Sequence, residues 1–167
     1  MNTHSATSHA SDLAVTLRPV QLADSATLHA VCWPDYAFDR VNQLIKRACT
    51  NHRNERGLGV VVTSNTNGAV IGFGQFTRWP RCGEISDLVI APPYRSRGLG
   101  TVLIQHLVQT ARQMGADCVE IGVSLDNPRA LALYRRLGFQ DDHTVQLDLG
   151  QGMEPVLYLR LSLVDHQ

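Results

Sequence analysis

Residues 88–100 read LVIAPPYRSRGLG, and they join a strand, a tight turn and a helix in thirteen residues. Its apolar start predicts a buried strand, its two prolines a tight turn, and its glycines the start of a helix. The first turn of a helix presents unpaired N–H groups and the positive end of the helix dipole, so such a junction binds phosphate readily. Gly98 and Gly100 let phosphates approach the backbone, while Arg95 and Arg97 add positive charge. The stretch therefore predicts a phosphate site, although the glycines could also serve only the tight packing of helix on sheet.

Two other phosphate motifs do not fit these residues. A dinucleotide-binding fingerprint needs a third glycine, but Leu103 stands at that position. A P-loop needs a lysine directly after its last glycine, and none follows Gly100.

Hydrophobic periodicity on both sides of this stretch predicts a mixed α/β domain. The predicted strands cover residues 15–19, 60–64, 69–79, 84–91, 118–125, 143–149 and 155–163. The predicted helices cover residues 24–33, 38–50, 98–114 and 128–137, and a turn is expected at 81–83. The order β-α-α-β-β-β-α-β-α-β-β implies a mixed sheet with helices on both faces.

The composition indicates one globular domain. Of the 167 residues 44% are hydrophobic, and 15 basic residues balance 15 acidic ones. This neutrality gives no long-range attraction to nucleic acid or to an anionic membrane, so neither is expected as a partner. Residues 1–12 lack the features of a signal peptide and are expected to be a flexible tail before a domain of residues 13–167. No segment approaches the ~20 apolar residues that span a bilayer. The cytoplasmic location that we expect rests instead on the cysteines, which we interpret as reduced thiols.

The cysteines give no metal or disulfide pattern. Cys32, Cys49, Cys82 and Cys118 are widely scattered, with no CxxC pair. We expect four reduced thiols and no bound metal, since the spacing of Cys49 and His52 is only a weak metal hint.

Two motifs resemble the signatures of the Gcn5-related N-acetyltransferases. The first, (Arg/Gln)-x-x-Gly-x-(Gly/Ala), is matched by Arg95, Gly98 and Gly100, and the strand before it by Leu88, Ile90 and Pro92. The second is matched by Asn127, Ala130, Tyr134, Gly138 and Phe139. The resemblance extends over residues 13–163. It implies the acyl-CoA N-acyltransferase fold, with splayed central parallel strands, and transfer of an acetyl group from acetyl-CoA to an amine.

The resemblance also implies a cofactor site. The pyrophosphate of acetyl-CoA would lie on the loop of residues 95–100, and the pantetheine arm would run between strands 86–91 and 122–125 like an added strand. Asn127 would cap the following helix, meet the pantetheine, or both. Arg135 and Arg136 could reach the phosphates or stay solvated. The implied cofactor residues are Leu88, Val89, Ile90, Arg95, Ser96, Arg97, Gly98, Leu99, Gly100, Thr101, Asn127, Ala130 and Tyr134.

Acetyl transfer needs a proton donor for the departing sulfur, and the resemblance assigns this role to Tyr134. A phenol with a reference pKa of ~10 stays protonated until it is needed. The alternative is a core tyrosine on the apolar face that also carries Leu131 and Leu137. The N–H of Ile90, at the splay, could stabilise the oxyanion.

The attacking amine must lose a proton, and the resemblance to histone-acetylating members assigns the base to Glu84. Asp87 is the rival base, a water chain is another possibility, and Glu84 could simply end a strand in solvent. Unless a bulge intervenes, strand alternation places one set of side chains on Glu84's face, namely Ser86, Leu88 and Ile90. No cysteine has a neighbouring histidine in sequence, so direct transfer in a ternary complex is expected.

The resemblance places the acceptor amine beside the first two helices and the loop at residues 151–154. These regions carry carboxylates and aromatic rings that suit a cationic amine, namely Trp33, Asp35, Tyr36, Phe38, Asp39 and Glu154. Small amines, antibiotics, peptide N-termini and protein lysines remain open as acceptors, and the last strands could support a homodimer.

Two other classes of function are compatible with the fold. A non-catalytic acyl-CoA sensor would not need the intact Tyr134 and Glu84. A structural module that has lost its cofactor would not need the intact glycine loop.

Overall fold

A computed structural model describes residues 13–165. The strands are β1 (Val15–Pro19), β2 (Gly57–Ser64), β3 (Val70–Arg78), β4 (Cys82–Ile90), β5 (Cys118–Ser124), β6 (Gln140–Asp148) and β7 (Met153–Ser162). The helices are α1 (Ser25–Cys32), α2 (Phe38–Arg53), α3 (Leu99–Gln113) and α4 (Pro128–Arg136), with short 3₁₀ helices η1 (Leu22–Asp24) and η2 (Pro92–Tyr94). The predicted order of strands and α-helices is confirmed. The predicted tail, residues 1–12, lies outside the described residues.

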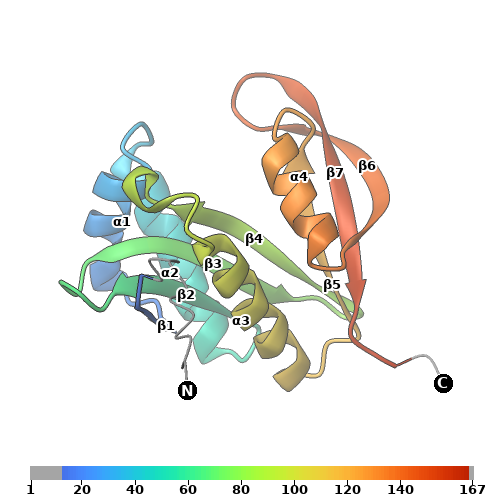
Figure 1. The fold of residues 1–167 in the computed structure, drawn as a ribbon, viewed down its shortest axis with the longest axis horizontal. Coiled ribbons are helices and arrows are strands. Elements are labelled where there is room, and N and C mark those ends of the chain that lie inside the picture. The colour runs from blue at the N-terminus through green and yellow to red at the C-terminus, as the bar shows by residue number, and fades with distance from the viewer. Residues whose placement is uncertain (1–12, 166–167) are drawn as a thin grey trace, which may run out of the picture.

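All seven strands form one sheet in the order β1-β2-β3-β4-β5-β7-β6 (Figure 1). Every neighbouring pair is antiparallel except β4 and β5, which run parallel. The parallel pair requires a crossover, and α3 provides it. The predicted mixed α/β fold is confirmed.

Two buried clusters fix the helices to the two faces of the sheet. On one face α1 and α2 bury Leu28 and Ile45 against Phe73. On the other face α3 and α4 cover a larger cluster, in which Leu107 packs with Phe76. Each such side chain contributes about 1.5–3 kcal/mol when fully buried. Among the described residues, no helix is both long and apolar enough to cross a bilayer.

The start of β4 corrects the sequence prediction. The turn expected at residues 81–83 is wrong, because Cys82 and Gly83 already belong to the strand. Gly83 is paired with Arg78 on β3, and a side chain at Gly83 would collide with the ring of Phe76. This glycine therefore marks the close approach of a core ring and not a turn.

Cys82 and Cys118 form a disulfide, with their Cα atoms 4.7 Å apart. They face each other at the start of the parallel strands β4 and β5. The expectation of four reduced thiols is therefore wrong for this pair, whereas Cys32 and Cys49 are free. The sequence did not indicate this pairing, because residues that are neighbours on parallel strands are separated in sequence by a whole crossover connection.

Reduction of the disulfide should destabilise the protein, because the cross-link closes a loop around the β4–α3–β5 crossover and so restricts the unfolded chain. We expect a loss of about 2–4 kcal/mol in unfolding free energy, measured by urea unfolding with and without dithiothreitol. The double variant C82S/C118S should match the reduced protein and ignore the reductant. The control C49S should still respond, and a wild type insensitive to reductant would contradict the prediction.

Candidate active site

Strands β4 and β5 separate partway along their length. They are paired only from Cys82 opposite Cys118 to Ile85 opposite Ile121. Beyond that point β4 continues alongside β3, and β5 continues alongside β7. The two halves of the sheet therefore diverge (Figure 1). The splay expected between residues 86–91 and 122–125 is present.

The backbone of Ile90 faces this gap. Ala91 donates its N–H to the carbonyl of Ile71 at 2.8 Å, which makes these two a hydrogen-bonded pair of the antiparallel ladder. Because such pairs alternate, the N–H and C=O of Ile90 point away from β3, whereas those of Val89 point toward it. Arg95 Nε donates to the Ile90 carbonyl at 2.9 Å. Of Val89 and Ile90, only Ile90 therefore has a backbone oriented toward a ligand between the strands.

The loop between η2 and α3 has the conformation of an anion cradle. Ser96 and Gly98 have left-handed backbones, with φ of 62° and 78°. A Cβ at Gly98 would meet no atom within 4 Å, so this position needs glycine for its φ, and the space in front of it is open. Helix α3 begins at Leu99, and the first amides of a helix have no intrahelical partner. The loop thus presents free N–H groups and a positive helix end, as a phosphate site requires.

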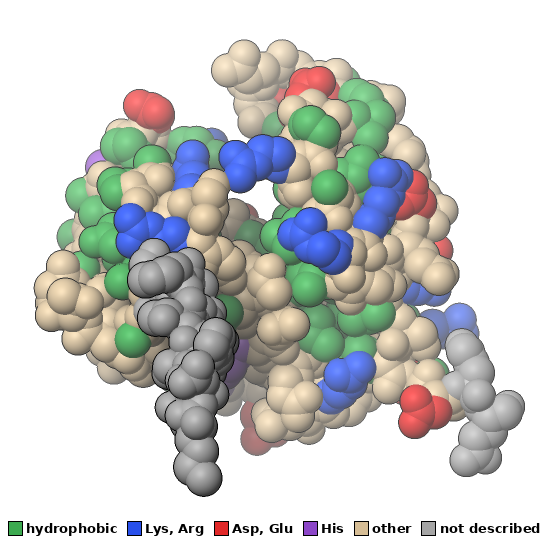
Figure 2. Space-filling view, viewed as in Figure 1, with side chains coloured by type: hydrophobic (Ala, Val, Ile, Leu, Met, Phe, Trp, Pro, Cys, Tyr) green, Lys and Arg blue, Asp and Glu red, His purple; other side chains and the backbone are tan. Residues whose placement is uncertain are grey.

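A cleft of about 750 Å³ follows this loop, the gap between the strands and α4. Figure 2 shows the hollow between the two halves of the molecule, with basic side chains around it. The predicted cofactor residues all line the cleft except Arg97, whose guanidinium lies 5.8 Å above the ring of Tyr94. Their roles in binding stay a prediction.

The sequence prediction missed Arg129. This residue lines the cleft from the first turn of α4, and its guanidinium donates to Ser96 Oγ at 2.8 Å, so it links α4 to the cradle. The sequence feature that could have identified Arg129 is its position two residues after the helix cap Asn127. Arg136 also lines the cleft, whereas Arg135 forms an ion pair with Asp141 at 2.6 Å.

Tyr134 reaches the cleft from α4 and is only 8% exposed. Burial raises the pKa of its phenol to about 12, so the hydroxyl is a proton donor over the whole neutral range. Asn127 caps the same helix, because its Oδ1 accepts a hydrogen bond from the N–H of Ala130 at 3.2 Å. The capping role is therefore present, and the contact with pantetheine stays a prediction.

A bulge in β4 changes the predicted sides of the strand. Gln75 is opposite Ser86 and Phe73 is opposite Val89, so two residues of β4 face one residue of β3. Asp87 lies in this bulge, with a φ of 56°. The predicted grouping of Glu84 and Ser86 with Leu88 and Ile90 is wrong. The last two pack into the cluster under α3 and α4, which is also the side of Ile85, whereas Glu84 faces the opposite side.

Glu84 is half-buried, and burial is the main cause that raises the pKa of its carboxyl. The negative charges of Asp87 and Glu120 raise this pKa further, while a hydrogen bond from Trp79 Nε1 at 3.4 Å opposes the rise. Asp87, the rival base, accepts hydrogen bonds from Gln75 Nε2 at 2.6 Å and from the Ser86 hydroxyl at 3.2 Å. The lone pairs of Asp87 are thus more engaged than those of Glu84.

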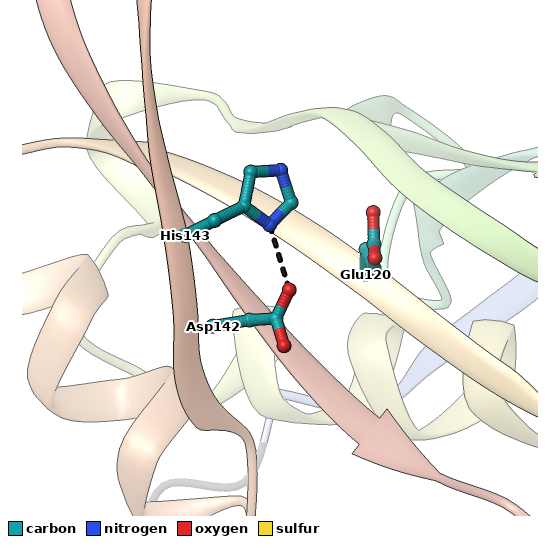
Figure 3. Close-up of side chains that lie close together, drawn as sticks. All are labelled: Glu120, Asp142 and His143. Atoms are coloured by element: carbon teal, nitrogen blue, oxygen red, sulfur yellow. Dashed lines mark hydrogen bonds and ion pairs between the residues drawn. The ribbon is translucent and has the colours of Figure 1, made fainter.

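Three further side chains meet near Glu84. One possible metal-ligand atom from each of Glu120, Asp142 and His143 lies within 4.8 Å of the other two. His143 Nδ1 is 2.7 Å from a carboxylate oxygen of Asp142 (Figure 3). The spacing would suit a cation. The guanidinium of Arg160, 2.7 Å from Glu120, already supplies a positive charge here.

The aromatic residues expected near the acceptor are engaged with one another. Trp33 stacks on Tyr36 with ring centroids 6.4 Å apart and meets Phe73 edge-on at 5.8 Å. Arg40 lies 4.1 Å above the Tyr36 ring. The role of this cluster toward an acceptor stays a prediction.

Comparison with known proteins agrees with this geometry. The profile of the acetyltransferase (GNAT) family matches residues 20–139, and the chain belongs to this family. The L-methionine sulfoximine/L-methionine sulfone acetyltransferase of Salmonella typhimurium is 30% identical over 125 residues, which cover 71% of each chain. The structure of yncA from Salmonella typhimurium with acetyl-CoA has a TM-score of 0.70 at 22% identity, covering 92% of this chain and 96% of that one.

Some relatives match over a shorter part. The streptothricin acetyltransferase of Streptomyces lavendulae is 34% identical over 80 residues, or 47% of this chain and 42% of that protein. An uncharacterized N-acetyltransferase of Methanocaldococcus jannaschii is 36% identical over 63 residues, or 38% of this chain and 28% of that protein. The chain therefore spans less than half the length of these two relatives.

The cradle can be tested with Gly98→Glu, which places a negative charge in front of the helix and a side chain at positive φ. We expect acetyl-CoA affinity, measured by calorimetry, to fall about 100-fold or more. The matched control is Gly68→Glu, in the β2–β3 turn, where φ is 70° and the space is equally open. Both variants should lose similar stability, and only the first should lose affinity. Equal affinities would refute the cradle.

Proposed function

We propose that this protein is an N-acetyltransferase that transfers the acetyl group of acetyl-CoA to a primary amine, by direct attack in a ternary complex. One observation carries the proposal. The left-handed glycine loop before α3 opens into the gap between β4 and β5, and Tyr134 lines the same cleft. Membership in the acetyltransferase (GNAT) family supports the same reaction.

The residues along the cleft fit acetyl-CoA. Gly98 and the first amides of α3 would hold the pyrophosphate, with Arg129 and Arg136 adding positive charge. The C=O of Ile90, which faces the gap, would accept a hydrogen bond from an amide of the pantetheine arm, as an edge strand pairs with an added strand, while its N–H stays free for the thioester carbonyl. Tyr134 would then lie at the thioester end.

Acetyl-CoA supplies a thioester, whose carbonyl carbon the amine attacks and whose sulfur leaves. Glu84 takes a proton from the ammonium, directly or through a water, so that an N–H bond breaks and an O–H bond forms. The N–H of Ile90 stabilises the negative charge that develops on the carbonyl oxygen. As the C–S bond breaks, Tyr134 gives its phenolic proton to the sulfur. The nitrogen still carries one excess proton after it has bonded to the carbonyl carbon, and this proton returns to the phenolate, directly or through a water. Since Glu84 and Tyr134 lie on opposite faces of the sheet, the amine enters on the side away from α4.

Tyr134→Phe should lower kcat by about 10- to 100-fold. This loss is at or below the lower end of the rate contribution of a general acid, because a thiolate leaves readily even without a proton. The affinity for acetyl-CoA should stay within a factor of about two, since the ring remains in place. Steady-state kinetics and calorimetry measure the two quantities. An unchanged kcat in Tyr134→Phe would remove the acid role.

Glu84 accepts a proton only when it is ionised, so kcat/KM should fall as the pH drops through the pKa of Glu84. Because this pKa is raised, the acidic limb should lie above the range of an ordinary glutamate. Glu84→Gln should abolish this limb and lower kcat/KM on the plateau by about 100-fold. Asp87→Asn is the comparison. A limb that survives in Glu84→Gln but disappears in Asp87→Asn would make Asp87 the base.

The acceptor class, the partners and the location complete the proposal. Each proton transfer is assigned to a side chain, so the scheme calls for no metal ion. We expect a cytoplasmic enzyme without nucleic-acid or membrane partners, able to form a homodimer through its last strands. The relatives are named for streptothricin and for L-methionine sulfoximine or sulfone. A panel of amines should include such compounds together with peptides and lysine.

The deciding experiment is release of coenzyme A across this panel, followed by mass spectrometry of the product. An acetylated amine supports the proposal. Binding of acetyl-CoA without turnover on any amine would instead favour a sensor domain.

A further inference from the structure

A row of three charged side chains crosses the sheet where the gap begins. Glu84 on β4 and Glu120 on β5 are directly opposite each other in the parallel register. Neighbouring strands lie about 4.8 Å apart, so both carboxylates rise from the same face at close range. On β7, Arg160 is opposite Glu120 and donates to its carboxylate at 2.7 Å. This is the last paired rung on that face, because pairing of β4 with β5 ends at Ile85.

We propose that Glu120 is a positioning residue for the transfer reaction, and that its carboxylate, anchored by Arg160, makes Glu84 ready to take the proton of the amine. The inference rests on the proposed role of Glu84 as the base. A negative charge at Glu120 disfavours a second one at Glu84, so Glu84 binds a proton more tightly. When the ammonium N–H bond breaks and the Glu84 O–H bond forms, the repulsion between the two carboxylates is relieved in that same step.

The charge on Glu120 is held in place from the far side. Arg160 donates a hydrogen bond to the Glu120 carboxylate at 2.7 Å, and this bond raises the pKa of Arg160. Arg160 stands beyond Glu120 in the row, so it fixes this carboxylate without standing between it and Glu84. Truncation of Arg160 and truncation of Glu120 should therefore act on Glu84 in opposite directions.

The ring of Tyr158 borders this row. A Cβ at Gly122 would lie 3.1 Å from Tyr158 Cζ, so the missing side chain lets the ring lie close over β5. The ring also stacks on His143, with centroids 5.2 Å apart. Burial raises the pKa of Tyr158, and the charges of Glu84 and Glu120 raise it further, so its hydroxyl senses the same pair of carboxylates. Partial exclusion of water by this ring strengthens the interaction between the two carboxylates.

Other charged groups on this face of the sheet also act on the pKa of Glu84, but they do not reverse the effect of Glu120. Glu84 accepts a hydrogen bond from Trp79 in the β3–β4 turn and lies among titratable or charged groups from four strands, namely Asp87, Glu120, Asp142, His143, Tyr158 and Arg160. Asp87 acts in the same sense as Glu120, but it already accepts two hydrogen bonds. Only Glu120 is both in register with Glu84 and fixed by a cation.

The test is a titration of the carboxyl carbons by ¹³C NMR on protein labelled at glutamate, with Glu84→Gln used to assign the signal of Glu84. This readout needs no acceptor substrate. In Glu120→Gln the titration midpoint of Glu84 should move to lower pH. In Arg160→Gln, where the charge of Glu120 is no longer compensated, it should move to higher pH. Asp141→Asn, which removes a carboxylate paired with Arg135, is the control and should leave the midpoint in place.

A midpoint that stays fixed in Glu120→Gln, or moves to higher pH, overturns the inference. Equal shifts in Glu120→Gln and Asp141→Asn would also overturn it, because the effect would then be one of net charge alone. Thermal unfolding and acetyl-CoA affinity check that each variant is folded.

The pH profile of kcat/KM separates this inference from the proposed function. If Glu84 is the base, the acidic limb in Glu120→Gln should follow the NMR midpoint to lower pH. A limb that persists in Glu84→Gln would end the role of Glu84 as base, while the NMR shifts would still decide whether Glu120 controls its protonation.

Discussion

The separation of β4 from β5 after a short paired segment creates the cleft and determines which backbone groups line it. Both strands keep a neighbour on their outer side, so the gap between them has two firm walls. The N–H of Ile90, which points away from β3 into the gap, is left for a ligand. A backbone donor without a partner is unfavourable wherever water is excluded. The fold therefore prepares one edge on β4 that an extended, amide-bearing molecule completes. The cradle at Gly98 and the phenol of Tyr134 lie along the cleft that includes this edge.

The bulge at Asp87 lets a single strand serve two purposes. Before it, the alternation of β4 turns Glu84 away from α3 and α4. After it, Leu88 and Ile90 pack toward those helices. A regular strand would keep all three side chains on one face, so the carboxylate and the apolar wall of the cleft would compete for the same side. The extra residue resolves this conflict at the cost of a non-glycine residue at positive φ.

Local motifs could be predicted from the sequence, whereas contacts across strands could not. The glycine loop and the Asn127 cap each depend on a few consecutive residues, whose conformational preferences are properties of the residues themselves. The disulfide, the pairing of Glu84 with Glu120 and the contact of Arg129 with Ser96 depend on register and on the placement of α4, which no local pattern encodes. The bulge was anticipated only as a possibility, because aspartate, although more common in the left-handed region than most residues, does not by itself fix the position of a bulge.

The disulfide also changes the outcome of proteolytic cleavage within this chain. Cys82 and Cys118 enclose β4, the glycine loop and α3 within one covalent ring. A protease that nicks the loop between Arg95 and Gly98 would produce two fragments that remain tied through sulfur. The nicked protein would keep its intact mass on a non-reducing gel and would come apart only after reduction. A backbone break anywhere within this ring, which includes the cleft-lining parts of β4 and α3 as well as the glycine loop, need not release either half of the sheet.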